Sequence, residues 1–289
     1  MLQRTDRVVI AVGDLEKAQK EMVAVLGRTP AWVGGYPADQ TQCVLFHLDN
    51  LNVELLSPVP GGDTPVCKAL QAQLDEHGGG LFALHLETED IASCLEAMRS
   101  QGLEPGDPYE GLTKDEPSGA FRRFVQSDLP EDQTAGVRLR IVEWQSKPEE
   151  LPPSLPLAGE ASAVSGGDHV VIFTAAPERA LDLFGTKLGV RLALDKTFEK
   201  RKTRLIFFRL GGYTIEIGAP FRDPSDEPVP DDRLWGLAFR VSDLDAVSER
   251  IKNAGLEVTG IRGGNKPGTR VCTVKNEPAG VATLMIQHD

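Results

Sequence analysis

The chain repeats itself, and this repeat restricts the possible folds more than any other feature of the sequence. Residues 6–58 align without a gap with residues 168–220, at a constant spacing of 162 residues. The two copies begin with DRVVIAVGDLEKA and DHVVIFTAAPERA and end with FHLDNLNVELLSP and FRLGGYTIEIGAP. Roughly a quarter of the aligned positions are identical, and an ungapped register over a whole structural unit indicates a duplicated fold.

The segments that follow the two copies resemble each other as well. Residues 81–104 align with residues 234–257, and the final strands AGVRLRIVEW and AGVATLMIQH also align. We therefore expect four modules, numbered first to fourth, over 1–59, 80–146, 164–220 and 232–289. Consecutive modules form two domains, 1–146 and 164–289, joined by a Pro-, Ala-, Ser- and Gly-rich linker over 147–163.

Each module is expected to contain the same order of elements. In the first, residues 7–13 form a strand rich in β-branched residues, Asp14 is the N-cap of a helix, and Gly27 ends that helix. Further strands follow, two of them joined by the Asp49-Asn50 turn. Residues 64–80 predict an additional connecting helix. The result is a βαβββ unit, and four such units predict an α+β fold with mixed sheets.

Composition excludes several classes of protein. The net charge of −12 argues against nucleic acid as a partner, because binding phosphates requires a basic surface. The longest apolar runs are too short to span a bilayer, so no membrane association is expected. The four cysteines lack the paired spacing of a disulfide framework or zinc ribbon, which favours a cytoplasmic protein. It is expected to be a monomer or a homodimer.

The repeated βαβββ unit, opened by DHVVIFT and closed by YTIEIGAP, resembles the vicinal oxygen chelate superfamily of glyoxalases, bleomycin resistance proteins and extradiol dioxygenases. The resemblance implies two glyoxalase-like domains in which paired modules form cup-shaped sheets. It also implies a divalent metal ion, Zn, Ni, Mn or Fe, in a cup, held by His on first strands and Glu on last strands. Such a metal leaves positions open for substrate oxygens.

The matching positions are filled unevenly in this chain. The third module has both ligand types, His169 and Glu216. The first has Arg7 and Glu54, and arginine cannot ligate a metal. The second has Glu143 on its last strand, Ala83 at the first-strand position and His85 two residues later on the same strand face, whereas the fourth has only Gly236 and Gln287.

The pairing of the modules decides which residues meet. If first pairs with second and third with fourth, both cups are incomplete. If second pairs with third and first with fourth, one cup collects the metal ligands His85, Glu143, His169 and Glu216, and the other is a degenerate ligand-binding cup with Arg7, Glu54 and Gln287. The second arrangement is preferred, because the losses fall together on the first and fourth modules.

Two functions follow from the resemblance. The first is a metal-dependent lyase or isomerase acting on a small substrate with adjacent oxygens, in which Glu143 or Glu216 transfers a proton. The alternative is a metal-free protein that binds a small molecule, as bleomycin resistance proteins do. Extradiol dioxygenase chemistry is disfavoured, because Gly236 and Gln287 stand at two of its three iron-ligand positions.

Overall fold

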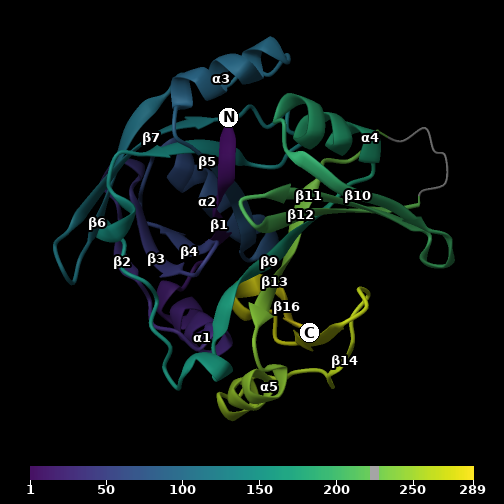
Figure 1. Ribbon diagram of the computed structural model, residues 1–289. Helices are drawn as coiled ribbons and strands as arrows, with labels where there is room; N and C mark the ends of the chain where they lie inside the picture. Colours follow the sequence, from purple (N-terminus) through teal and green to yellow (C-terminus); the bar gives the residue numbers. More distant parts are fainter. Residues whose placement is uncertain (222–227) are drawn as a thin grey trace.

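The computed structural model describes residues 1–221 and 228–289, and two eight-stranded sheets dominate it (Figure 1). The first sheet contains β1 (Leu2–Ala11), β2 (Trp32–Tyr36), β3 (Thr41–His47), β4 (Asn52–Pro58), β5 (Gly80–Thr88), β6 (Tyr109–Asp115), β7 (Phe121–Asp128) and β8 (Leu139–Trp144). The second contains β9 (Val164–Phe173), β10 (Arg191–Phe198), β11 (Thr203–Leu210), β12 (Tyr213–Pro220), β13 (Arg233–Val241), β14 (Arg262–Gly263), β15 (Thr269–Val274) and β16 (Ala282–His288). The predicted α+β architecture with mixed sheets is confirmed.

Helices accompany the two sheets, and the first of them begins and ends where the sequence predicts. They are α1 (Leu15–Leu26), α2 (Pro65–His77), α3 (Ile91–Ser100), α4 (Pro177–Ala180, continued as a π-helix over Leu181–Lys187) and α5 (Leu244–Asn253). The Asp14 side chain accepts the amide proton of Lys17, and Gly27 ends α1 in the left-handed conformation with φ 65°. No helix among the described residues is long and apolar enough to cross a bilayer.

The pairing of strands decides how the modules combine, and it corrects the preferred arrangement. β1 pairs with β5 in the first sheet, and β9 pairs with β13 in the second. The first module therefore shares a sheet with the second, and the third shares one with the fourth. The prediction that the second module pairs with the third was wrong. Strand pairing is a long-range interaction, so the pattern of losses along the sequence does not determine it.

The first sheet closes into a barrel where β2 meets β6, and Gly34 lets these two strands approach; the neighbouring Gly35 lies close to β3. β2 pairs with β6 through Gly34 opposite Asp115 and Gly35 opposite Lys114. A Cβ atom at Gly34 would lie 1.8 Å from the Lys114 carbonyl oxygen, and one at Gly35 would lie 2.3 Å from the Thr41 oxygen. No other residue can be accommodated at either position without moving the backbone.

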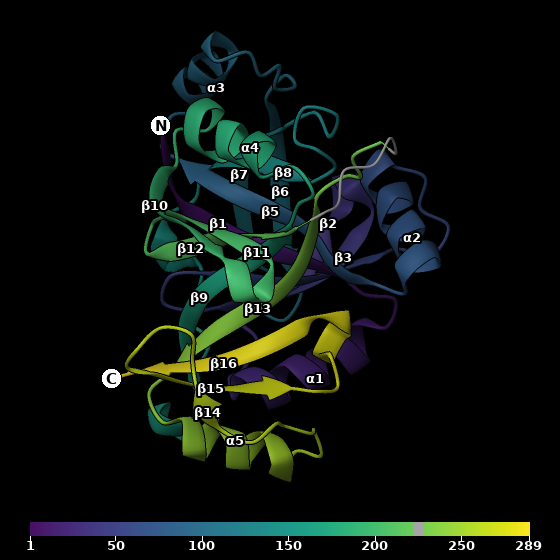
Figure 2. The same cartoon turned by 90° about the vertical axis from the view of Figure 1, so that its right-hand side faces the viewer.

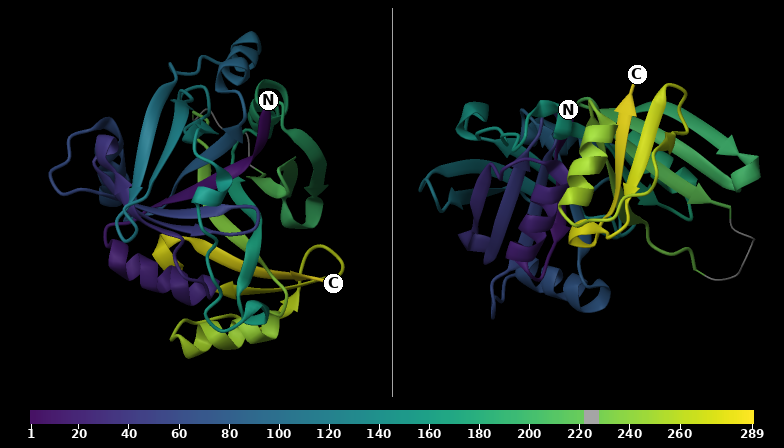
Figure 3. Two further views of the ribbon diagram at one scale, coloured as in Figure 1. Left: turned by 60° about the vertical axis from the view of Figure 1, so that its left-hand side comes forward. Right: turned by 90° about the horizontal axis from the view of Figure 1, so that it is seen from below.

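The second sheet stays open, with β10 and β14 as its outer strands. The spacing of the repeat places Lys196 and Thr197 of β10 where the first copy has Gly34 and Gly35. β14 has only two residues, so it offers little backbone for pairing. Figure 1 and the right panel of Figure 3 show the β10–β11 hairpin extending away from the rest of the sheet.

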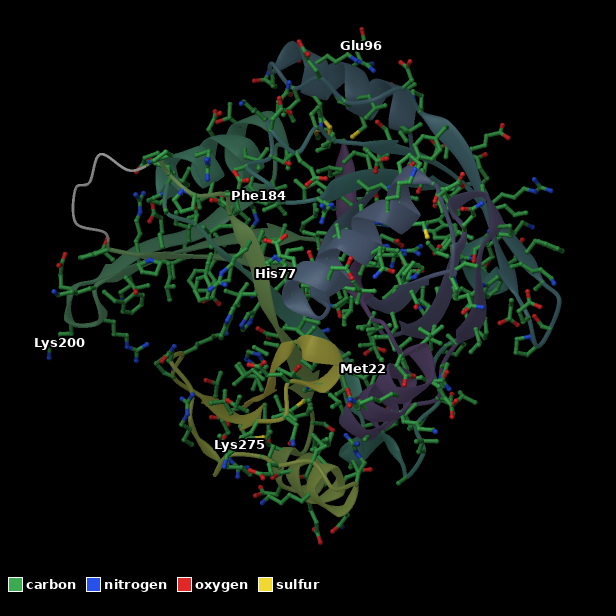
Figure 4. The ribbon with its side chains drawn as sticks, turned by 180° about the vertical axis from the view of Figure 1, so that it is seen from behind. Met22, His77, Glu96, Phe184, Lys200 and Lys275 are labelled. Carbon is green, nitrogen blue, oxygen red and sulfur yellow. The ribbon has the colours of Figure 1, made fainter. Side chains whose placement is uncertain are left out.

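The two halves share one hydrophobic core and are also joined by polar contacts. Met22 of α1 and Phe184 after α4, both labelled in Figure 4, belong to the same buried cluster. Arg250 of α5 donates to the carbonyl oxygens of Ala24 and Val25 at the end of α1. A cation at a helix C-terminus is favourable, because the carbonyl groups there carry partial negative charge.

Replacing Gly34 with alanine is expected to destabilise the barrel by about 2–3 kcal/mol, because the new methyl group collides with backbone at the closing seam. Urea denaturation measures this free energy of unfolding. Gly260→Ala is the matched control, since a Cβ there meets no atom within 4 Å. Equal stability of the two variants would contradict the proposed role of Gly34.

Candidate functional site

A β-bulge sets the geometry of the candidate site in each half. Thr5 pairs with Leu86 and Arg7 with His85, so Asp6 lies between them without a partner on β5. In the second sheet Gly167 pairs with Phe239 and His169 with Ala238, so Asp168 likewise has no partner on β13. A bulge turns the strand locally, and the side chains of successive residues then meet instead of alternating. Asp6 contacts Arg7, and Asp168 contacts His169.

In the barrel, Arg7 lies at the centre of a buried polar network. Its Nε donates to Asp6 at 2.6 Å, and its Nη1 donates to both carboxylate oxygens of Glu54 at 3.1 Å and to the Tyr36 hydroxyl at 2.5 Å. The indole of Trp144 donates to Asp6 at 3.0 Å. Arg7, Asp6 and Glu54 are at most 3% exposed. Burial favours a neutral Asp6, but Arg7 and Trp144 outweigh it and lower the pKa of this carboxyl group.

His85 lies beside this network, between two arginines. The strand register places it opposite Arg7 on β1 and opposite Arg140 on β8. In the part of the chain that the structure describes, the imidazole has no hydrogen-bond partner, although His85 is only 9% exposed. Burial, and then the positive charges of Arg140 and Arg7, lower the pKa of His85 well below its usual range. The imidazole is therefore neutral at pH 7.

These residues face a cavity of about 250 Å³ inside the barrel. Its polar and charged lining consists of Arg7, Tyr36, Asp39, Glu54, His85, Gln126, Asp128, Glu131, Arg138 and Arg140. Its apolar lining includes Val9, Leu56, Phe82, Ala83, Phe124 and Val142. Residues of α2 also line it, and Figure 2 shows this helix beside the barrel.

In the open sheet, four titratable side chains form a chain of contacts. Nε2 of His288 lies 2.8 Å from Asp168, whose other oxygen lies 2.7 Å from Nδ1 of His169. Nε2 of His169 lies 3.4 Å from Oε2 of Glu216. Burial raises the pKa of Glu216. Burial would also raise the pKa of Asp168, but the two histidines outweigh it and lower the value to about 2.

The structure unites some of the predicted site residues and separates others. Arg7 meets Glu54, and His169 meets Glu216, as the family's first-strand and last-strand positions imply. Glu143 does not line the cavity: it accepts the Ile91 amide proton at the start of α3, at 2.8 Å. Gln287 likewise accepts the Leu244 amide proton at the start of α5, so it does not join Arg7 in a degenerate cup.

Sequence reasoning missed the residues that follow Glu143 and Gln287. Trp144 and His288 are the ones that contact the bulge aspartates Asp6 and Asp168. The alignment of AGVRLRIVEW with AGVATLMIQH already matches Trp144 with His288. Both residues end their strands and carry a ring nitrogen that can donate a hydrogen bond. This shared property of aligned residues could have identified them as partners of the aspartates.

The donor set in the barrel does not fit a divalent metal ion. The guanidinium of Arg7 stands at a ligand position and already pairs with Glu54, the remaining carboxylate there. In the second half, His169 and Glu216 are suitable donors, and Asp168 orients the imidazole as an outer-shell carboxylate does. Within residues 1–221 and 228–289, no group of three or more His, Cys, Asp or Glu side chains could hold a metal ion. The structure thus does not bring His85, Glu143, His169 and Glu216 together.

Comparison with known proteins places the fold in a family. A family model for the glyoxalase/bleomycin resistance protein/dioxygenase superfamily matches residues 6–116 and 168–273. Mitochondrial methylmalonyl-CoA epimerase of Mus musculus is 31% identical over 102 residues, 35% of this chain and 55% of that protein. An ethylmalonyl-CoA/methylmalonyl-CoA epimerase of Cereibacter sphaeroides is 29% identical over 114 residues, 38% of this chain and 82% of that protein. The chain spans about half the length of the mouse and human epimerases that it matches.

Solved structures share the complete architecture at low sequence identity. A triple mutant of 4-hydroxymandelate synthase from Streptomyces coelicolor superimposes with a TM-score of 0.70 and 16% identity, over 100% of this chain and 93% of that one. A hypothetical protein from Staphylococcus aureus gives a TM-score of 0.65 and 10% identity, over 99% and 100%. At these identities the likeness concerns the fold alone.

The buried neutral imidazole of His85 is expected to make stability depend on pH. Because its pKa is lower in the folded than in the unfolded state, the unfolded chain binds more protons, and stability falls as the pH drops below about 6.5. His85→Gln should reduce the stability lost between pH 7.5 and 5.5 by about 1 kcal/mol, measured by urea denaturation. His77→Gln, at an exposed position, should leave the loss unchanged; the same loss in wild type and His85→Gln would refute the assignment.

Proposed function

This chain belongs to the glyoxalase/bleomycin resistance protein/dioxygenase superfamily, and we propose that its barrel binds a small organic molecule in the internal cavity. Members of this superfamily bind small molecules, and the curated relatives named above are epimerases of coenzyme A thioesters. The proposal assigns the binding site to the first half of the chain, where the polar row of Arg7, His85 and Arg140 and apolar residues line the same cavity.

The single observation that supports this proposal most strongly is His85. Buried polar groups in proteins are almost always hydrogen-bonded, because an unpaired one loses the hydrogen bonds that water supplied. His85 is 9% exposed, lines the cavity and has no partner among the described residues. A ligand in the cavity would supply that partner. Apolar walls with a few converging polar groups are also typical of small-molecule sites.

Filling the cavity is the direct test. Ala83 is 6% exposed and lines the cavity, so an Ala83→Phe side chain would occupy part of the ligand volume. We expect acidic, neutral and basic aromatic fragments that bind the wild-type protein to lose at least tenfold in affinity for this variant, measured by ligand-observed NMR. The apolar residue Phe121 is 51% exposed, so Phe121→Ala is the control for a change outside the cavity. Equal fragment binding by wild type and Ala83→Phe would contradict the proposal.

A second candidate function, metal-dependent isomerase or lyase activity, concerns the second half. Two ligands of one tetrahedral Zn²⁺, each about 2.1 Å from it, stand about 3.4 Å apart. Nε2 of His169 and Oε2 of Glu216 have this separation, and Asp168 holds Nδ1 so that Nε2 points to Glu216. A divalent cation held there would supply Lewis-acid chemistry to a substrate oxygen. With two protein donors, water or substrate would complete its coordination.

Metal content tests this second candidate. After dialysis against Zn, Ni, Mn and Fe salts, we expect near one equivalent of metal per chain, because His169 and Glu216 already stand at ligand spacing. His169→Ala should lose this equivalent, whereas His77→Ala, at an exposed position, should retain it. Absence of metal from the wild-type protein in every salt would exclude this candidate and leave the cavity proposal unaffected.

A further inference from the structure

The arginine that replaces a metal ligand in the barrel restricts what the cavity can bind. In the repeat, Arg7 stands where the other half has His169. Its Nη1 contacts both oxygens of Glu54, so the neighbouring carboxylate is occupied by a guanidinium and not by a metal. Recognition in this cavity must therefore depend on hydrogen bonds from protein cations.

The row across the cavity offers several unused hydrogen-bond donors. Nε and Nη1 of Arg7 are bound to protein oxygens, but Nη2 has no partner among the described residues. Arg140 uses only Nε, which donates to Asp128 at 2.6 Å. Its two terminal nitrogens, Nη1 and Nη2, have no protein acceptor within residues 1–221 and 228–289. His85 lies between the two guanidinium groups in the strand register.

The charges around His85 favour a negatively charged group beside it. The two charged groups that act on the imidazole are Arg140 and Arg7, and both are cations. Three of the four carboxylates that line the cavity contact a cation: Glu54 contacts Arg7, Asp128 contacts Arg140, and Glu131 contacts Arg138. The fourth, Asp39, has no side-chain partner among the described residues, and the charge of Arg140 acts on it as well. Hydrogen bonds between a guanidinium and a carboxylate are roughly twice as strong as bonds between neutral groups.

We infer that the barrel binds the carboxylate of a small organic acid without a metal ion, between Arg7 and Arg140 and against His85. This inference rests on the proposed function of the barrel and names the ligand class. The apolar part of the acid lies against Phe82, Phe124 and Val142, which line the same cavity. At about 250 Å³, the cavity accommodates an acid with one aromatic ring or a short aliphatic chain.

The experiment compares a carboxylate with its neutral amide. Isothermal titration calorimetry of the full chain in EDTA is performed with phenylacetate, butyrate and phenylacetamide. We expect the acids to bind at least tenfold more tightly than the amide, with the same affinity in EDTA as in buffer that contains Zn²⁺. Arg140→Gln should weaken the acids at least tenfold and leave the amide unchanged. Arg123→Gln removes the same charge from an exposed position and should have no effect.

Four outcomes would contradict the inference, and they differ in whether the proposed function also fails. Equal affinity for phenylacetate and phenylacetamide, or acid binding that EDTA abolishes, would refute recognition of a carboxylate by the arginines. If no acid binds below about 10 mM while neutral fragments bind wild type and not Ala83→Phe, the inference fails and the proposed function stands. If no fragment distinguishes wild type from Ala83→Phe, both fail. Circular dichroism of Arg140→Gln separates lost recognition from lost folding.

Discussion

The close approach of β2 to β6 is the constraint on which the candidate site depends. The backbone oxygen of Lys114 on β6 occupies the space in which a side chain at Gly34 would lie, and on the other side of β2 the backbone oxygen of Thr41 on β3 does the same at Gly35. With these glycines the sheet closes, and residues on its inner face surround a cavity. The second copy has Lys196 and Thr197 at the equivalent positions, and its sheet is open. Two small residues thus separate an internal binding volume from an exposed sheet face.

Both halves have a bulge at the equivalent position, but the residues around the two bulges differ. Each bulge brings together an aspartate, the residue that follows it and the last residue of β8 or β16. In the barrel these are Asp6, Arg7 and Trp144; in the open sheet they are Asp168, His169 and His288. One half therefore holds a buried cation paired with carboxylates, and the other holds imidazoles that can donate, accept or ligate.

Burial of Arg7 explains why its network is so complete. An unpaired charge in a protein interior costs several kcal/mol, and loss of one partner leaves the other exposed to that cost. Asp6 and Glu54 neutralise the guanidinium, and the uncharged side chains of Tyr36 and Trp144 add hydrogen bonds to these charged groups. Polar groups satisfied in this way keep one geometry, which holds the unused nitrogen of Arg7 in place at the cavity. His85 has no such partners, which distinguishes a residue available to a ligand from one committed to the fold.

The sequence by itself determined the repeat, the βαβββ order and the helix caps of the first module. These features depend on local spacing, so they can be read from one copy and checked against the other. The neighbouring positions of Arg7 and Glu54, and of His169 and Glu216, were implied by the resemblance to a family whose ligands lie on first and last strands. The tertiary structure alone decided which modules share a sheet, because strand pairing joins segments far apart in the chain. It also decided that Glu143 and Gln287 face helices while Trp144 and His288 reach the bulges, since a shift of one residue exchanges the two faces of a strand.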